Sequence, residues 1–277
     1  MKLTKTAVKN FQNIVLTYFR NNGRLFPWRT SFDPYHILVS EVMLQQTQTE
    51  RVTPKFEAFI SRFPTVESLA EGSQAEVLKL WQGLGYNRRG MNLHRAAIEI
   101  SEKFGGKIPA DSEQLMSLPG IGPYTLSAIQ AFAFNQPVVV IETNIRAVYI
   151  HHFFSDQSQN IKPLVKDSQL VPLIEQTLDR SQPRVWYSAL MDYGSYLKSQ
   201  VPNPTRRSHH YTKQSKFEGS PRQLRGQILK LLTTSDSTTV AEIHRRTKRP
   251  LKEVKKIVEQ LERESFITKQ NGTIRLK

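Results

Sequence analysis

Leu118-Pro-Gly-Ile-Gly-Pro-Tyr-Thr-Leu-Ser-Ala128 is the most informative segment of the chain. Gly120 and Gly122 stand two positions apart and leave the backbone N–H groups of a turn unshielded by side chains. A helix of small residues follows from Pro123, and the positive end of its dipole points at the same place. The segment therefore predicts a turn that binds a phosphate, although its first letters alone also fit an ordinary tight turn.

The chain as a whole is strongly basic. It has 277 residues, enough for roughly two domains, and its 39 Lys and Arg against 24 Asp and Glu give a net charge of +15. A surplus of this size indicates a polyanionic partner. No run of about 18 apolar residues is present, so we expect no membrane span. The N-terminus, Met1-Lys-Leu-Thr-Lys5, lacks an apolar signal core, which favours the cytoplasm as the location.

The sequence contains no cysteine. This excludes a disulfide, a thiol nucleophile, a cysteine-bound zinc and an iron–sulfur cluster. The adjacent His151 and His152 would point in different directions on a helix, and no matching set of carboxylates accompanies them. We therefore predict packing roles for both histidines and no metal site.

The positive charge is concentrated near the C-terminus. Residues 198–277 contain 19 of the basic residues and only 7 of the acidic ones. Residues 201–220 are rich in proline and polar residues and predict a basic linker, in which Arg206 and Arg207 would contact the polyanion. Ser220 then has the pattern of a helix N-cap, followed by proline at the first helical position.

Residues 221–277 carry the pattern of a winged helix-turn-helix. Apolar residues at helical spacing predict three helices, and Asn271-Gly272 between two apolar stretches predicts a type I′ hairpin after them. The third helix carries Lys252, Lys255 and Lys256. Positive charge on a helix that can enter a groove favours binding to DNA or RNA, whereas protein binding by the winged helix is the alternative.

The first two hundred residues are predicted to be mostly helical. Apolar residues recur at helical spacing, and no alternating strand of any length is visible. Pro64 breaks the pattern, and Thr65 is the expected cap of the helix that follows. Val138-Val-Val-Ile141 is ambiguous, since a short strand, a buried extended segment and a helix start would each fit.

Glu41 is the one carboxylate in the apolar helix Ile37-Leu-Val-Ser-Glu-Val-Met-Leu-Gln-Gln-Thr-Gln48. Leu38, Val42 and Met43 crowd it, and an apolar setting raises the pKa of a carboxyl group. A raised pKa suits a general acid. The alternative is an exposed or ion-paired surface residue.

Glu142 follows four apolar residues at the expected start of another helix. Because Thr143 and Asn144 come next, the carboxylate is predicted to be ionised and held by the first backbone amides of that helix. Such a carboxylate could stabilise an oxocarbenium ion or activate water. A simple N-capping acid fits the same pattern.

Together these segments resemble the adenine-DNA glycosylases (MutY), a family of the helix-hairpin-helix (HhH-GPD) superfamily of DNA-repair enzymes. The resemblance covers residues 26–200 and rests on Phe26-Pro-Trp-Arg29, Ser40-Glu-Val-Met-Leu-Gln-Gln-Thr-Gln48, Arg62-Phe-Pro-Thr65, Leu80-Trp-Gln-Gly-Leu-Gly-Tyr86, Asn92-Leu-His94, Leu118-Pro-Gly-Ile-Gly-Pro-Tyr-Thr125 and Ala189-Leu-Met-Asp-Tyr-Gly194. The string that begins at Glu41 is specific to this branch, because the endonuclease III and thymine-mismatch branches differ there.

The resemblance implies a mainly α, two-lobed helix-hairpin-helix glycosylase fold, with the winged helix-turn-helix following it. Residues 1–28 and 137–200 would form one lobe, and residues 29–136 would form a six-helix lobe that contains the hairpin. The active cleft would lie between the lobes and would accept a base flipped out of the duplex, because the glycosidic bond is unreachable inside the stack.

The resemblance also implies a role for each matched residue. Glu41 would protonate the flipped base so that it leaves neutral, with Tyr124 and Asn144 around that carboxyl and the sugar. The base pocket would be lined by Trp28, Arg29, Leu44 and Asp192. DNA would be contacted by Gln46 in the gap of the stack, by Tyr86 near the opposite base, and at the hairpin by Gly120, Gly122 and Thr125. Since Schiff-base enzymes of the superfamily have Lys where Tyr124 stands, the resemblance implies a monofunctional hydrolase.

The chain departs from the family at three places. Glu142 stands where the family has Asp, and its extra methylene displaces the carboxylate relative to C1′ of the sugar. The four cysteines that ligate the family's iron–sulfur cluster are replaced by Lys198, Thr205, Ser208 and their neighbours. The usual C-terminal domain that senses 8-oxoguanine is replaced by the winged helix.

We therefore predict a DNA glycosylase of base excision repair that hydrolyses the N-glycosidic bond of a flipped, mispaired adenine opposite G or 8-oxoguanine. The alternatives are a glycosylase for another damaged or mispaired base and a catalytically inactive DNA-binding homologue. The expected partner is double-stranded DNA with a mismatch or lesion. The expected state is a monomer in the cytoplasm, associated with the nucleoid in a bacterial or archaeal cell. No cofactor is predicted, and a monovalent cation at the hairpin is left open.

Overall fold

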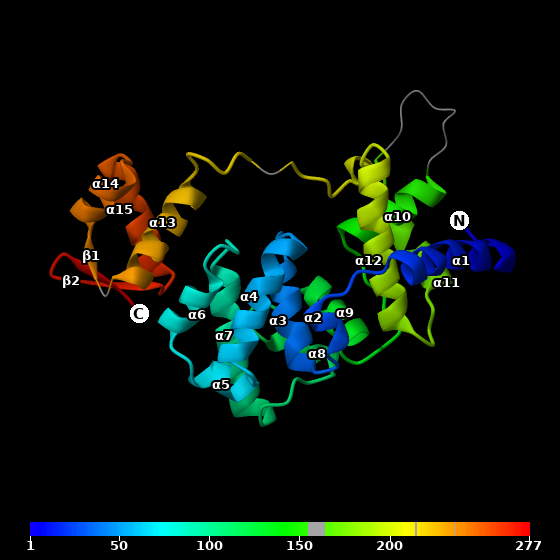
Figure 1. Cartoon of the computed structure of the whole chain (residues 1–277), viewed down its shortest axis with the longest axis horizontal. Coiled ribbons are helices and arrows are strands. Elements are labelled where there is room, and N and C mark those ends of the chain that lie inside the picture. The colour runs from blue at the N-terminus through cyan, green and yellow to red at the C-terminus, as the bar shows by residue number, and fades with distance from the viewer. Residues whose placement is uncertain (155–163, 214, 236) are drawn as a thin grey trace. The chain divides into compact units, whose positions relative to one another are not determined.

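The computed structural model of the chain describes residues 1–154, 164–213, 215–235 and 237–277, and residue 214 of the predicted linker lies outside them (Figure 1). These residues are mainly helical, as predicted. None of the described helices is both long and apolar enough to span a bilayer. The chain divides into two compact units, and each combines segments that are far apart in sequence. The first unit comprises Met1–Glu41, Ala110–Ser117 and Ile121–Lys213, and the second comprises Val42–Pro109, Leu118–Gly120 and Gln214–Lys277.

The regular elements of the first unit are helices in its described residues, and one isolated β-bridge joins Val165 to Ser208. Its elements are α1 (Lys5–Asn22), α2 (Pro27–Thr30), the first part of α3 (Pro34–Leu44), α8 (Ser112–Ser117), α9 (Pro123–Phe132), α10 (Thr143–Phe153), α11 (Asp167–Thr177), α12 (Pro183–Gln200) and the 3₁₀ helix η1 (Pro204–Arg207).

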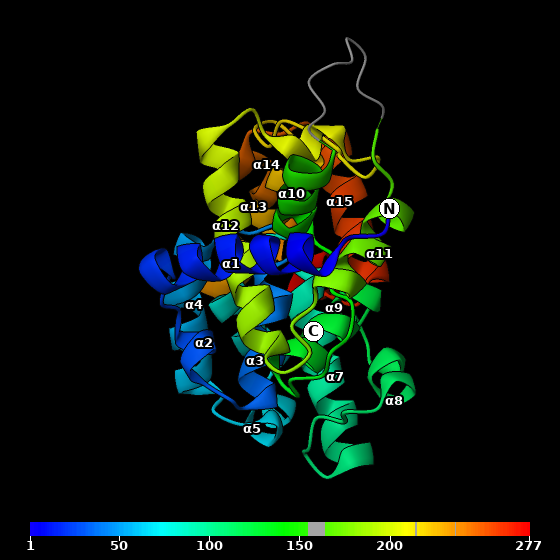
Figure 2. The same cartoon turned by 90° about the vertical axis from the view of Figure 1, so that its right-hand side faces the viewer.

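The core of the first unit forms where α1, α10 and α12 pack together, and Figure 2 shows α1 crossing α12. The ring of Phe11 on α1 lies 5.2 Å from that of Tyr149 on α10 and 5.9 Å from that of Trp186 on α12. Gly194 permits the close approach of α12 to α10, because a Cβ at this position would collide with the backbone carbonyl of Asn144. The start of α10 is therefore held directly against α12.

The segment Val138–Ile141 is extended and belongs to no sheet, which resolves the ambiguity left by the sequence. Two of its backbone polar groups are satisfied by one side chain. The hydroxyl of Tyr187 on α12 donates to the Val138 carbonyl at 2.7 Å and accepts from the Val140 N–H at 3.1 Å. Val140 is buried while its neighbours are half-buried, and a segment of this kind can avoid a sheet when a side chain supplies such partners.

The second unit contains one group of helices and the C-terminal module. The helices are α4 (Thr49–Arg62), α5 (Val66–Glu71), α6 (Gln74–Trp81) and α7 (Arg88–Phe104). The predicted cap at Thr65 is confirmed, since its side chain accepts from the Ser68 N–H in a capping box. The C-terminal module consists of α13 (Pro221–Thr234), β1 (Thr238–Thr239), α14 (Val240–Thr247), α15 (Leu251–Arg263), β2 (Ile267–Gln270) and β3 (Thr273–Leu276).

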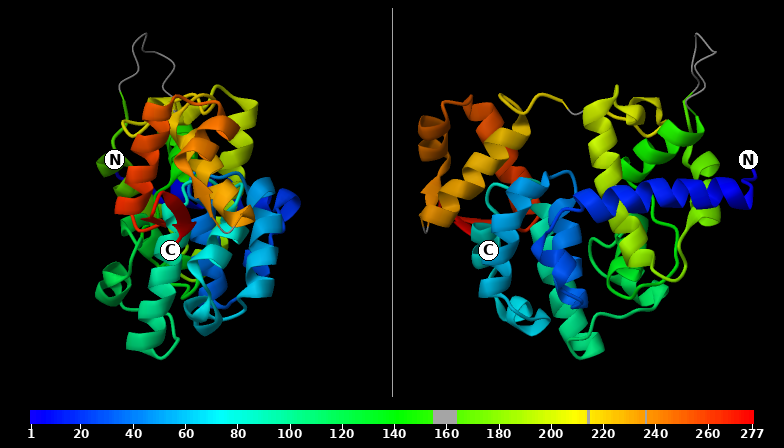
Figure 3. Two further views of the ribbon diagram at one scale, coloured as in Figure 1. Left: turned by 90° about the vertical axis from the view of Figure 1, so that its left-hand side faces the viewer. Right: turned by 45° about the vertical axis from the view of Figure 1, so that its right-hand side comes forward.

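The C-terminal module has the three helices and the hairpin predicted for a winged helix (Figure 3, left). Its three strands pair antiparallel in the order β1-β3-β2, with Ile267 opposite Leu276. Asn271 and Gly272 have φ values of 48° and 78°, which confirms the turn of the I′ type. The predicted N-cap is also confirmed, because the Ser220 hydroxyl accepts from the Gln223 N–H at 3.3 Å.

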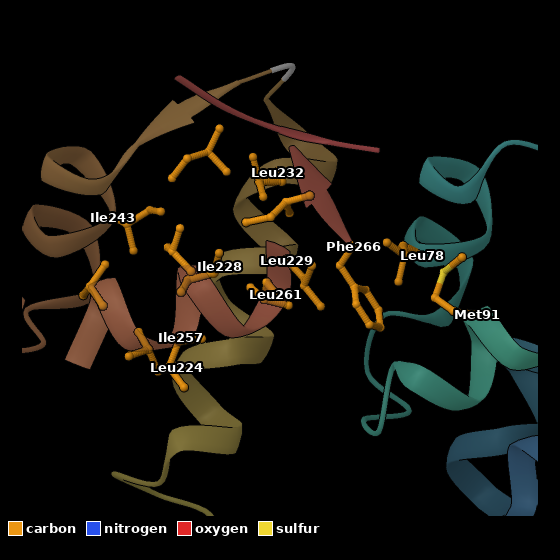
Figure 4. Close-up of a cluster of buried hydrophobic side chains, with 14 residues drawn as sticks. Leu78, Met91, Leu224, Ile228, Leu229, Leu232, Ile243, Ile257, Leu261 and Phe266 are labelled. Carbon is orange, nitrogen blue, oxygen red and sulfur yellow. The ribbon is translucent and has the colours of Figure 1, made fainter. Parts of the chain in front are cut away.

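The hydrophobic core of the winged helix continues into the helices beside it (Figure 4). The ring of Phe266, which is 1% exposed, extends from the start of β2 toward Leu78 on α6 and Met91 on α7. An ion-pair network borders this contact, because Glu264 binds Arg88 at 2.8 Å and Arg225 at 2.7 Å. The winged helix is therefore packed onto α6 and α7 within the second unit.

The two units differ from the predicted lobes. The boundary expected after residue 28 lies at residue 41, inside α3, and residues 110–117 and 121–136 group with the first unit. The packing of α9 against α8 and α12 accounts for the second difference. The winged helix, expected to be separate, shares its core with α6 and α7.

Removal of the Phe266 ring tests this shared core. Phe266→Ala is expected to lower the free energy of unfolding by about 3–5 kcal/mol, because a buried aromatic side chain is replaced by a cavity. Chemical denaturation followed by circular dichroism measures the change. Thr268→Ala, on the exposed face of β2, is the matched control and should stay within about 0.5 kcal/mol. An unchanged midpoint for Phe266→Ala would contradict the packing in Figure 4.

Candidate active site

Glu41 is a buried carboxyl in the apolar part of α3, with only 5% of the residue exposed. Leu38, Val42 and Met43 around it are buried as well. Burial raises the pKa of Glu41 to about 7, against the opposing effect of a hydrogen bond from Tyr124. The predicted rise of the pKa is confirmed, and its cause is the predicted one.

Tyr124 is the direct partner of this carboxyl. Its hydroxyl donates to Glu41 Oε2 at 2.9 Å. Burial, together with the nearby Glu41 and Glu142 charges, raises the pKa of Tyr124 well above its usual value. Tyr124 therefore remains a proton-bearing donor at neutral pH. The glycine turn before α9 brings it there, since Gly122 is the N-cap of α9 and Tyr124 is its second residue.

Glu142 caps the N-terminus of α10, as expected. Its Oε1 accepts from the backbone N–H groups of Asn144 at 2.6 Å and Ile145 at 2.9 Å. Its Oε2 accepts from Asn144 Nδ2 at 3.3 Å. Burial raises the pKa of Glu142, while these donors and the cations Lys198 and Arg146 lower it. The sequence predicted an ionised Glu142 from the α10 amides alone. Burial opposes that ionised state, and the sequence did not reveal this effect.

The two carboxyl groups lie close enough to act on each other, because the charge of Glu142 raises the pKa of Glu41. Their surroundings differ. Glu142 receives three hydrogen bonds and faces the cations Lys198 and Arg146, whereas Glu41 receives a side-chain hydrogen bond from Tyr124 and a smaller electrostatic effect from Arg29. When the pair holds a single proton, these surroundings favour the proton on Glu41 and the negative charge on Glu142.

Asn144 offers an acceptor beside this pair. Its Nδ2 is used by Glu142, while its Oδ1 is buried and has no hydrogen-bond partner among the residues that the structure describes. A buried acceptor of this kind needs a hydrogen from a ligand or a water molecule.

Arg29 and Asp192, both predicted in the base pocket, bind each other. Arg29 contacts the two carboxylate oxygens at 2.7 and 2.9 Å, and Arg24 Nε donates to Oδ1 at 2.8 Å. Burial alone would raise the pKa of Asp192, but the hydrogen bonds from Arg29 and Arg24 lower it overall. The carboxylate therefore fixes Arg29 in place. Trp28 is buried next to them and stacks on Phe26, with ring centroids 5.0 Å apart.

The hairpin residues fit the predicted turn. Gly120 has φ +82°, and a Cβ there would lie 2.8 Å from Cβ of Asn92. Gly122 faces open space. Thr125 is buried, with only 2% of the residue exposed, so its predicted contact with DNA would require a change in its surroundings.

Three predicted contacts lie in the second unit at the end of α3 and before α7. Leu44 is half-buried, while Gln46 and Tyr86 are exposed and have positive φ values of 56° and 47°. One guanidinium supports both turns. Arg89 donates to the Gln45 carbonyl at 2.5 Å and to the Leu84 carbonyl at 3.2 Å, and it lies 5.5 Å from the Tyr86 ring centroid.

The basic residues predicted to bind DNA differ in their exposure. Arg206 in η1 is exposed, but Arg207 is half-buried and donates to the Phe154 carbonyl, so its role is at least partly structural. On α15 the side chains of Lys252, Lys255 and Lys256 are all exposed.

Sequence reasoning missed Arg24, Arg89 and Lys198 as supports of the site. Arg24 lies in an irregular segment, and Arg89 begins a helix whose pattern indicates only its apolar face. Lys198 was noted only as a replacement for a cysteine. Lys198 follows Gly194 by one helical turn on α12. This spacing is the sequence signal that could have placed Lys198 on the face of α12 toward the start of α10.

Comparison with known proteins assigns the chain to a protein family. Residues 39–172 match the family model of the HhH-GPD superfamily of base excision DNA repair proteins. The adenine DNA glycosylase of Mycolicibacterium smegmatis is 34% identical over 243 residues, covering 81% of this chain and 80% of the relative. That of Buchnera aphidicola subsp. Baizongia pistaciae is 34% identical over 68% of this chain and 52% of the relative. The human one is 34% identical over 68% of this chain and 36% of the relative.

Solved structures agree on the fold. A thermostable thymine-DNA glycosylase superposes with a TM-score of 0.60 at 26% identity, covering 68% of this chain and 86% of that one. A non-covalent endonuclease III–DNA complex gives a TM-score of 0.58 at 16% identity, covering 74% of this chain and 99% of that one. At this identity the likeness shows the common fold alone. The fold and site thus define a helix-hairpin-helix protein of base excision repair. Within that superfamily, the chain belongs to the adenine DNA glycosylase family.

The residues of this chain do not fit the iron–sulfur cluster of the family, because no thiolate is present. Other contacts hold the segment after α12. The Val165 N–H donates to the Arg207 carbonyl at 2.7 Å, and the His209 N–H donates to the Val165 carbonyl at 2.9 Å. Throughout the described ranges, no three His, Asp or Glu side chains gather as a metal site.

The raised pKa of Glu41 has a consequence for stability. Below the unfolded pKa of about 4.5 the neutral carboxyl is buried at little cost, and this advantage is lost as the pH rises through the folded value of about 7. Glu41→Gln removes that loss. The variant should match the wild type at pH 5 and exceed its free energy of unfolding by about 1–3 kcal/mol at pH 8. Denaturation midpoints at the two pH values test this, and an equal difference at both would contradict it.

Proposed function

We propose that this protein is a monofunctional adenine-DNA glycosylase of base excision repair, which hydrolyses the N-glycosidic bond of an adenine flipped out of mismatched duplex DNA. The observation that carries the proposal is the hydrogen bond from Tyr124 to Glu41, a buried carboxyl whose pKa is about 7, beside the second carboxyl of Glu142. The relatives named adenine DNA glycosylase support adenine as the base.

The first step is protonation of the base. With a pKa of about 7, Glu41 is protonated in about half of the molecules at neutral pH and can donate to a ring nitrogen of adenine. The C1′–N9 bond then breaks, its electron pair moves to the base, and adenine leaves as a neutral molecule. Tyr124 occupies Oε2 of Glu41, which leaves Oε1 to carry the proton.

The second step is capture of the sugar cation. The Glu142 carboxylate stabilises the positive charge at C1′, while Oδ1 of Asn144 accepts a hydrogen bond from the attacking water. Water adds to C1′, and its proton passes to the Glu41 carboxylate, which regains its starting state. Because Tyr124 stands where Schiff-base enzymes have Lys, no covalent link to the sugar forms.

We propose the remaining contacts from the matched residues and their placement. Arg29, fixed by Asp192, and the buried Trp28 would bound the adenine, with Leu44 on α3 beyond Glu41. Phosphates would bind at Gly120 and Gly122 and along Lys252, Lys255 and Lys256. Gln46 would fill the gap in the stack, and Tyr86 would meet the base opposite adenine, which we take to be G or 8-oxoguanine. The protein would act as a monomer in the cytoplasm, at the nucleoid in bacteria or archaea, without a cofactor.

Base release from defined duplexes tests the reaction. We expect single-turnover release of adenine opposite G or 8-oxoguanine, with little release opposite C and none of uracil or mispaired thymine. Glu41→Gln and Glu142→Gln should each slow release by about 100-fold or more, because one lacks the proton and the other the charge. Binding without release from any duplex would contradict the proposal, and Glu113→Gln, at an exposed position of α8, is the matched control.

The length of Glu142 can be tested in the same assay. Glu142→Asp should still cap α10 but withdraw its carboxylate by one methylene, and we expect release to slow about 10- to 100-fold. A faster reaction would show instead that the longer side chain is a handicap.

The pH dependence tests the roles of the two acids. Above pH 7 the rate should fall about tenfold per pH unit, because the protonated form of Glu41 is lost. Tyr124→Phe removes a hydrogen bond that lowers the pKa of Glu41, so the break in the profile should move to higher pH. Single-turnover rates between pH 5 and 9 measure both, and a break that stays in place would exclude Glu41 as the titrating group.

A further inference from the structure

Tyr86 is held at both ends of its side chain. It is exposed, with a φ of 47°, on the turn between α6 and α7. The guanidinium of Arg89 lies over its ring, 5.5 Å from the centroid. At the far end, Arg222 Nη1 donates to the Tyr86 hydroxyl at 3.1 Å.

Arg222 belongs to the winged helix, where it occupies the first turn of α13. Its other terminal nitrogen, Nη2, donates to the carbonyl of Ser215 at 2.8 Å and to its hydroxyl at 3.0 Å. The guanidinium is thus fixed on the side away from Tyr86. A guanidinium with two such anchors has little freedom left and can define the position of a third group.

Several contacts join the C-terminal module to the helices on either side of the turn that carries Tyr86. Phe266 packs toward Leu78 and Met91, one on each side of this turn in the sequence (Figure 4). Arg88, two residues after Tyr86, is bound to Glu264, and Gln82 donates a hydrogen bond to Thr233 on α13. These contacts place the winged helix and the turn in one compact unit.

We propose that Arg222 is a positioning residue for Tyr86, through which the winged helix sets the ring that meets the base opposite the flipped adenine. The proposal rests on the function proposed above, in which Tyr86 enters the stack. An aromatic ring that enters a base stack must adopt one orientation, and a side chain fixed beforehand loses less freedom on binding. The winged helix would then contribute to recognition of the opposite strand through an internal contact as well as through its lysines.

A fluorescence assay separates this role from simple attraction to phosphate. The probe is a duplex with an A opposite G, in which 2-aminopurine neighbours the G and brightens when Tyr86 separates it from that base. We expect Arg222→Ala and Tyr86→Phe each to reduce the fluorescence rise about 3- to 10-fold at saturating protein. The double variant should be no worse than either single one, because both remove the same hydrogen bond.

Two controls make the outcome decisive. Arg222→Lys keeps the charge but cannot hold Tyr86 and Ser215 together, so we expect only partial recovery. Lys230→Ala, on the exposed side of the same helix, should leave the signal unchanged. Full recovery by Lys, or additive effects of Arg222→Ala and Tyr86→Phe, would overturn the proposal, as would a loss of affinity that is equal for matched and mismatched duplexes. Thermal midpoints must stay within about 3 °C of the wild type.

The same variants should lose discrimination between A opposite G and A opposite C, measured by single-turnover release. The fluorescence signal does not need cleavage of the glycosidic bond. A protein that releases no base but keeps an Arg222-dependent signal would contradict the proposed reaction alone, whereas normal release with a signal independent of Arg222 would contradict this inference alone.

Discussion

The hydrogen bond between the Tyr124 hydroxyl and the buried carboxyl of Glu41 is the contact on which the site depends. A carboxyl group in an apolar helix costs free energy when it is charged, and Tyr124 reduces that cost only in part. The balance leaves the pKa of Glu41 at about 7. A stronger donor, such as an arginine in direct contact, would hold the group as an anion, and no donor at all would keep it neutral. One phenol gives the intermediate state that a general acid requires.

The N-termini of two helices position the other side chains of the candidate active site. The turn at Gly120 and Gly122 begins α9 and thereby presents Tyr124 in the first turn, close to the backbone groups that can bind a phosphate. Glu142 begins α10, and the close approach allowed by Gly194 fixes that end against α12. The same local rule, a carboxylate or phosphate at the positive end of a helix, would serve DNA binding at the first place and chemistry at the second in the function proposed above.

The sequence was informative wherever the signal is local. The burial of Glu41, the cap formed by Glu142 and the turn at Asn271-Gly272 each depend on residues within one or two helical turns. Among contacts between distant segments, the approach of Tyr124 to Glu41 was indicated by the resemblance, but others were not predicted. Arg24 meets Asp192 across 168 positions, Arg207 turns inward to Phe154, and α3 crosses from one unit to the other. Such contacts depend on the packing of whole helices, which no short pattern specifies.

Glu142 and Lys198 show how a buried acid at a helix start is kept ionisable. The Glu142 carboxylate accepts from the α10 amides with one oxygen and from the Asn144 side chain with the other. Burial would then neutralise it, but Lys198 is among the cations that lower its pKa. Lys198 lies on α12, which packs against the start of α10, and the charge of its ammonium group favours the anionic form of Glu142.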